Sequence, residues 1–474
     1  MSSRWPSQTL LTERSPQASM YSITSIAVRL AALGHVNQSI ELLSLSNAYY
    51  PVEPSYMYRP GLYFAFEAVD KWPAFVPSEH RTPEKLSEIE EEMSWGQRHE
   101  MFQLHGEPRP PQLKHDVGDL KRLLEWRESG ERGMLAYTFE GNDEWFIKLS
   151  TQSVVLLSLD IALGIGGHEE EVARLQEIVK ADLNTYMPCV GQSRRIWTLL
   201  KTGVLEPEGS KKNIDAEFSR VKKVLEQLLD AGVQRPFQDQ SMEEIVHTID
   251  KNTRRPEYRE EDEDHGLQLD QKQPNAVRKD SILHHPASAQ SIAALETRLD
   301  TALPEDYKEF LSITDGMNAV WNGFYKESFV ASSSITKYVG DIFKGDTIPC
   351  ELLPWEELPR DFEVGWPPID FKYVIQLQDE EYGHVHGTWL VRPEMTRKAV
   401  EAFFERFESE GDRKSKKTVE RVVTNYFGGI EQLRATDWAL LRWHGQGGAF
   451  AWASFRDFLE TLAVNSGQSL YLDW

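Results

Sequence analysis

Ala294–Met317 reads ALETRLDTALPEDYKEFLSITDGM, and this stretch decides the fold of the C-terminal part of the chain. It predicts two helices separated by a break before Pro304, which suits the first position of a helix because its missing N–H is not needed there. Asp315-Gly316 then predicts the turn that ends the second helix. The apolar residues of the second helix share one face at helical spacing: Tyr307, Phe310 and Leu311.

A second amphipathic stretch near the C-terminus, Ser454–Leu462 (SFRDFLETL), predicts a closing helix. The segments Phe371–Leu377 and Val385–Val391 alternate in the manner of strands. The C-terminal part therefore combines helices with a sheet.

The opening LPEDYKEFL and the closing SFRDFLETL together resemble the Smi/Knr (SUKH) family over residues 281–465. The resemblance implies an α+β domain in which helices cover a central sheet and the surface recognises proteins. In fungal members it goes with cell-wall synthesis and integrity signalling, and in bacterial members with toxin neutralisation. This chain departs from the family pattern at Asp315-Gly316-Met317, where a double glycine is usual, and in a longer helical insert at Thr396–Trp443.

The composition favours protein partners. The chain has 474 residues and a formal net charge of -23, a sign that repels nucleic-acid phosphates and anionic lipid. Two cysteines cannot form a disulfide framework, and no apolar run approaches the ~18 residues of a membrane helix. We expect an acidic protein of the cytoplasm or nucleus that binds proteins, with no nucleic acid, no membrane span and an open oligomeric state.

The predicted fold class is α+β, with a mainly helical N-terminal domain followed by a SUKH-like domain. We expect a disordered tail over residues 1–20, the helical domain over 21–250, a charged linker over 251–280 and the Smi/Knr-like domain over 281–474. The linker prediction depends on TRRPEYREEDEDHGLQLDQKQPN, which is dense in charge and poor in apolar anchors.

Four aromatic residues in loops of the C-terminal domain are candidate partner-binding anchors, because exposed aromatic side chains dominate many interfaces. Core packing is an equally good interpretation of each of them. They are Trp321, Phe324, Tyr325 and Trp366.

The sequence offers no catalytic constellation. Asp379, Glu380, Glu381, His384 and His386 are the best metal candidates, but an acidic hairpin turn explains them better. Gly164–His168 fits a connection between helices better than a phosphate loop, Cys189 fits a packed side chain, and Gly445–Gly448 fits a turn. We therefore expect no cofactor, no metal and no enzymatic activity. The alternative hypothesis is an unrecognised enzyme with its site between the two halves.

Overall fold

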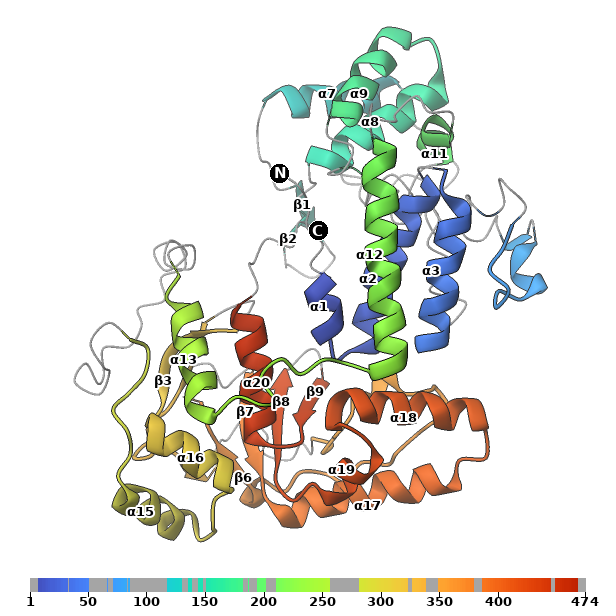
Figure 1. The fold of residues 1–474 in the computed structure, drawn as a ribbon. Helices are drawn as coiled ribbons and strands as arrows, with labels where there is room; N and C mark the ends of the chain where they lie inside the picture. Colours follow the sequence, from blue (N-terminus) through green and yellow to red (C-terminus); the bar gives the residue numbers. More distant parts are fainter. Residues whose placement is uncertain are drawn as a thin grey trace. The chain divides into compact units, whose positions relative to one another are not determined.

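The computed structural model describes residues 7–32, 34–50, 66, 71–82, 84–85, 117–129, 135–138, 144–147, 151–181, 186, 194–201, 210–255, 281–322, 326–337, 348–378, 386–444 and 448–467. The chain forms two compact units (Figure 1). The first contains residues 1–3, 18–230 and 473–474, and the second contains residues 4–17 and 231–472. Of the described helices, none has the length and apolar character needed to span a membrane.

The first unit is mainly helical, as the sequence predicts. Its helices are α2 (Pro16–Ala32, which begins in the second unit), α3 (Val36–Tyr49), α7 (Val117–Ser129), α8 (Thr151–Ile165), α9 (Glu169–Ala181), α11 (Arg194–Lys201) and α12 (Ser210–Ala231), with the 3-10 turn η1 (Ser78–Arg81). Strands β1 (Leu135–Thr138) and β2 (Glu144–Ile147) add an antiparallel hairpin. Gly166 and Gly167 connect α8 to α9 with positive φ angles of 72°, which confirms the predicted connection.

The second unit is the α+β part. Its helices are α1 (Ser7–Thr12), α13 (Met242–Thr253), α15 (Ala289–Leu299), α16 (Glu305–Ile313), α17 (Pro393–Ser409), α18 (Arg413–Phe427), α19 (Ile430–Ala435) and α20 (Phe455–Ser466), with the 3-10 turns η5 (Trp355–Glu357) and η6 (Phe371–Tyr373). Its strands are β3 (Met317–Trp321), β4 (Lys326–Phe329), β5 (Thr336–Lys337), β6 (Val374–Gln376), β7 (His386–Val391), β8 (Ala439–His444) and β9 (Gly448–Trp452).

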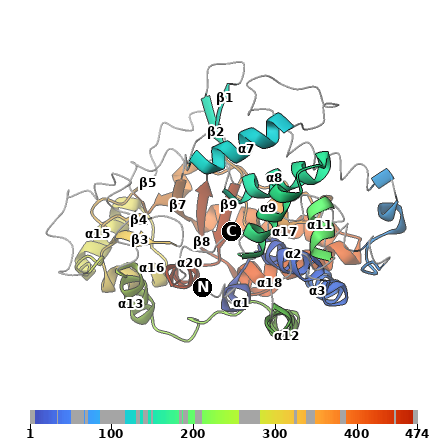
Figure 2. The same cartoon turned by 90° about the horizontal axis from the view of Figure 1, so that it is seen from above.

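Strands β5 to β9 form an antiparallel sheet in the order β5-β6-β7-β8-β9, and β3 pairs with β4 beside it. A bridge between Phe329 and Gln378 connects the pair to the larger sheet. Ile375, Leu390 and Leu440 are neighbours in register and belong to the core beneath α16 and α20. Successive side chains of a strand point to opposite faces of the sheet, so the neighbours of these three residues point away from α16 and α20. Figures 1 and 2 show α17 and α18 on that opposite side.

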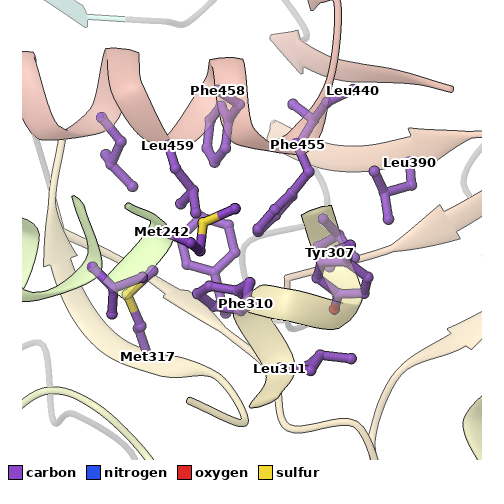
Figure 3. Close-up of a cluster of buried hydrophobic side chains, with 14 of the residues drawn as sticks. Met242, Tyr307, Phe310, Leu311, Met317, Leu390, Leu440, Phe455, Phe458 and Leu459 are labelled. Atoms are coloured by element: carbon purple, nitrogen blue, oxygen red, sulfur yellow. The ribbon is translucent and has the colours of Figure 1, made fainter. Parts of the chain in front are cut away.

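The predicted opening and closing helices pack against each other in one core. The ring of Phe455 on α20 meets Tyr307 on α16 edge-on at 4.7 Å between centroids, and meets Phe310 at 4.9 Å (Figure 3). All three residues are no more than 2% exposed. Edge-to-face rings of this kind add stability beyond the burial of their area. The α/β unit expected from LPEDYKEFL and SFRDFLETL is therefore confirmed.

The turn after α16 also follows the sequence. Gly316 has a φ of 107°, and a Cβ at this position would lie 2.5 Å from the carbonyl oxygen of Phe329. Only glycine fits without a shift of the backbone. Pro304 differs slightly from expectation, because it caps α16 and the first helical residue is Glu305.

Three expectations from the sequence need correction. Helix α13 belongs to the second unit, where Met242 and Ile245 are buried in the same core as Phe455, so the helical N-terminal domain does not extend to residue 250. Residues 7–12 and 16–20 are helical rather than a disordered tail. The expected helical insert over 396–443 ends at Ala435, because β8 begins at Ala439 and completes the sheet.

Candidate peptide-binding site

The structure describes two of the four candidate aromatic anchors, Trp321 and Trp366. Trp321 is only 2% exposed and lies on β3, so it packs in the interior, and its interpretation as an exposed anchor is wrong. Trp366 is half-buried. Phe324 and Tyr325 lie outside the described residues. Among the described residues, Trp355 in η5 is instead the tryptophan that is strongly exposed, at 61%.

The metal candidates at 379–385 lie outside the described residues, as do Cys189 and residues 445–447; His386 begins β7. Within the part of the chain that the structure describes, there is no group of three or more His, Cys, Asp or Glu residues that could hold a metal ion. Cys350 is buried, and burial raises the pKa of its thiol to about 12. This thiol is therefore a poor nucleophile at neutral pH.

A group of buried and half-buried polar side chains lies at the start of α20. The Ser454 hydroxyl caps the helix by accepting a hydrogen bond from the backbone N–H of Asp457 at 3.1 Å. Asp457 then lies in the first turn, where the helix dipole favours a negative charge. Its side chain is nevertheless almost completely buried, since the residue is 3% exposed. A carboxylate buried in this way requires positively charged partners.

One of these partners comes from the other end of the sequence. The Arg14 guanidinium lies 2.6 Å from Asp457 Oδ2 and donates a further hydrogen bond of 2.8 Å to the backbone carbonyl of Tyr426 on α18. The Arg14 side chain is 14% exposed. The N-terminal segment, described over residues 7–17, is thus held on the second unit through a nearly buried arginine.

The other positive charges at this site belong to the second unit's own body. Arg235 lies 2.9 Å from both Asp457 Oδ1 and Glu460 Oε2. Arg456 contacts Glu460 Oε1 at 3.1 Å and donates a hydrogen bond to the carbonyl of Gln238 at 3.2 Å. Because Arg235 bridges both carboxylates, the pocket stays partly neutralised when Arg14 is removed.

Next to Arg14 lies a second group of polar side chains. The Tyr426 hydroxyl donates a 2.8 Å hydrogen bond to Glu357 Oε1, and the Ser15 hydroxyl is hydrogen-bonded to the same carboxyl group. Burial, with a smaller contribution from the neighbouring carboxyl of Glu13, raises the pKa of Glu357 to about 8. Burial also raises the pKa of Glu13, whose carboxyl accepts the Ser15 N–H at 2.9 Å. This carboxyl pocket strongly disfavours negative charge.

The backbone of the N-terminal segment is also bound. The side-chain amide of Asn425 donates to the Arg14 carbonyl at 3.1 Å, and the Gln234 N–H donates to the Leu11 carbonyl at 2.7 Å. Leu10 and Pro16 are buried at either side of this stretch. A buried arginine, bound backbone carbonyls and buried apolar residues are the features by which a peptide is held in a peptide-binding domain.

The sequence alone could not reveal this site. Asp457 and Glu460 occupy positions of α20 that read as an ordinary solvated helix face, and a lone arginine in a polar N-terminal stretch gives no sign of burial. One available signal was the Leu10-Leu11 pair, which is apolar for a supposed tail. The match between Arg14 and Asp457 is a long-range contact that no local pattern encodes.

Comparison with known proteins supports the C-terminal resemblance. No curated protein and no solved structure matches the chain. The model of the SMI1 / KNR4 family (SUKH-1) matches residues 286–391, from just before α15 to the end of β7. The resemblance of the C-terminal part of this chain to the SMI1/KNR4 (SUKH-1) family is therefore confirmed over that range.

Proposed function

We propose that this chain is a non-catalytic, protein-binding regulatory protein whose C-terminal domain recognises an arginine-containing peptide segment. The observation that carries the proposal is the N-terminal segment itself, which occupies a built site with Arg14 against Asp457. A site that binds one segment of its own chain has the chemistry to bind a similar segment of another protein.

The chemistry of the site defines the partner. Asp457 and Tyr426 select an arginine, which can donate to both a carboxylate and a carbonyl from one planar group. Leu10 and Pro16 indicate apolar residues before and after that arginine. The net charge of -23 favours the approach of a basic segment. Exposed Trp355 adjoins Glu357 in η5 and offers additional apolar area near the site.

A labelled peptide with the sequence of residues 4–17 tests the proposal by fluorescence anisotropy. The full-length Arg14→Ala chain should bind it, because its own segment is weakened, while the unaltered chain should bind at least about tenfold more weakly because its site is occupied in cis. A peptide carrying alanine in place of Arg14 is the matched control and should not bind. Absence of saturable binding to the Arg14→Ala chain at millimolar peptide would overturn the proposal.

The biological process is proposed from the family resemblance. Regulation of cell-wall synthesis or of integrity signalling is the role that the Smi/Knr resemblance implies, with a cytoplasmic or nuclear location. Deletion of the encoding gene should alter sensitivity to a wall-binding dye, and Asp457→Asn should reproduce the effect. Normal growth of the deletion strain under wall stress would argue for another process.

A further inference from the structure

The stretch 13–15, between α1 and α2, places a serine hydroxyl next to the carboxyl pocket. Ser15 is half-buried, its hydroxyl is hydrogen-bonded to the Glu357 carboxyl, and its N–H is bound by Glu13. Glu357 is itself only 3% exposed. A group added to the Ser15 oxygen would therefore have to enter space that buried carboxyl groups occupy.

We propose that Ser15 is a phosphorylation site, and that its phosphate releases the N-terminal segment from the peptide-binding site of the C-terminal domain. The inference depends on the function proposed above, for which it supplies the regulation. In the covalent step, Ser15 Oγ attacks the γ-phosphorus of a nucleoside triphosphate held by a protein kinase. The new Oγ–P bond replaces the bond to the departing nucleoside diphosphate, and the hydroxyl proton passes to the kinase.

Charge and space both drive the release. A phosphoserine carries about -1.5 to -2 charges at pH 7 and needs several hydrogen-bond donors. Ser15 contacts Glu13 and Glu357, Tyr426 donates to the same Glu357 carboxyl, and the nearby guanidinium of Arg14 is engaged by Asp457. The pocket already disfavours a single carboxylate, so a phosphate dianion costs more. In the released segment, the same phosphate is free in water.

The order of events follows from the contacts of the serine. Ser15 is half-buried and its hydroxyl is engaged by the Glu357 carboxyl, so a kinase modifies the open population more readily and the phosphate then prevents return. The phosphate is compatible with the released segment but not with the bound one, so it shifts the equilibrium toward release. Removal of the phosphate by a phosphatase restores the bound segment and closes the site to other partners.

Hydrogen exchange of the full-length chain tests the switch, because the Gln234 N–H is protected by the Leu11 carbonyl only while the segment is bound. Three chains are compared: the unmodified chain, a chain with phosphoserine installed at position 15, and a chain with phosphoserine at the exposed Ser333. Phosphoserine at 15 should accelerate exchange in the peptide containing Gln234 by at least about tenfold, since a dianionic phosphate would lose hydration in a pocket that already disfavours one negative charge. Phosphoserine at 333 should leave it unchanged.

Two outcomes overturn the switch. One is unchanged exchange at Gln234 in the chain with phosphoserine at 15, and the other is equal acceleration by phosphoserine at 333. Failure of the function is distinguishable from failure of the switch. If phosphoserine at 15 releases the segment but the labelled peptide does not bind the Arg14→Ala chain, the switch stands without the proposed peptide recognition. If the peptide binds but phosphoserine changes nothing, the switch alone is wrong.

Discussion

Replacement of Arg14 by alanine should release the N-terminal segment from the second unit. Arg14 makes one charged hydrogen bond of 2.6 Å to Asp457 and one of 2.8 Å to a backbone carbonyl. A hydrogen bond to a charged group contributes about 1.5–3 kcal/mol, and loss of the only partner of a buried charge costs about 3–5 kcal/mol. Because Arg235 still lies 2.9 Å from Asp457, the lower range applies.

We therefore expect the bound state of the segment to lose roughly 2–3 kcal/mol, or roughly 30- to 150-fold in population, at 1.4 kcal/mol per factor of ten. Thermolysin measures this change, because it cuts before Leu10 or Leu11 and Leu10 is only 6% exposed while the segment is bound. When opening and closing are fast, the rate of cleavage is proportional to the open population. Intact mass spectrometry follows the loss of the first residues.

Two substitutions act as controls for this experiment. Arg14→Lys keeps the charge but loses the planar group that binds carboxylate and carbonyl together, so its cleavage rate should fall between those of the unaltered chain and Arg14→Ala. Arg397→Ala removes an arginine of the same unit from an exposed pair with Asp437, where both side chains are more than half exposed. Such a pair contributes about 0–1 kcal/mol, so cleavage should not change. A rate for Arg14→Ala within about twofold of the unaltered chain would refute the reasoning.

Three further predictions follow from the core, the turn and the carboxyl pocket. Phe455→Ala should destabilise the second unit by about 3–5 kcal/mol in urea unfolding, because the ring is buried against Tyr307 and Phe310; a loss below about 1 kcal/mol would contradict that packing. Gly316→Ala should lower the melting temperature, since the new Cβ meets a carbonyl oxygen at 2.5 Å, and an unchanged melting temperature would exclude the described turn. Binding of the labelled peptide should weaken as the pH rises from 6 to 9, because burial in the bound state raises the pKa of Glu357 to about 8 and also raises the pKa of Glu13; Glu357→Gln combined with a peptide that carries Glu13→Gln should remove this dependence, and its persistence would assign it to another group.

The sequence predicts the fold of the C-terminal domain well where local chemistry decides it. Tyr307, Phe310 and Leu311 share a helix face in the sequence and are buried together in the structure. Gly316 marks a backbone conformation that other residues resist. The sequence does not predict the β8–β9 hairpin, because Thr396–Trp443 resembles a helical insert and Gly445–Gly448 a turn. It also does not show that α13 belongs to the second unit, since an amphipathic face does not reveal the core against which it packs.

The candidate site lay almost wholly beyond prediction. Exposure decides whether an aromatic residue can bind a partner, and the exposure of Trp321 and Trp355 differs for reasons of tertiary structure alone. Likewise, Arg14 and Asp457 gain their roles only when segments from the two ends of the sequence meet. A sequence pattern indicates the helix or strand in which it lies. A binding site depends on how several helices, strands and loops are arranged in the folded chain.

The coupling energy between Arg14 and Asp457 tests the central claim most directly. Thermolysin cleavage rates of the unaltered chain, Arg14→Ala, Asp457→Asn and the double variant complete a double-mutant cycle that isolates this one contact. If the segment is bound through this contact, the coupling energy is about 1–3 kcal/mol and the double variant is cleaved little faster than Arg14→Ala. Strictly additive effects, with a coupling near zero, would show that Arg14 does not bind Asp457 and that the N-terminal segment does not occupy this site.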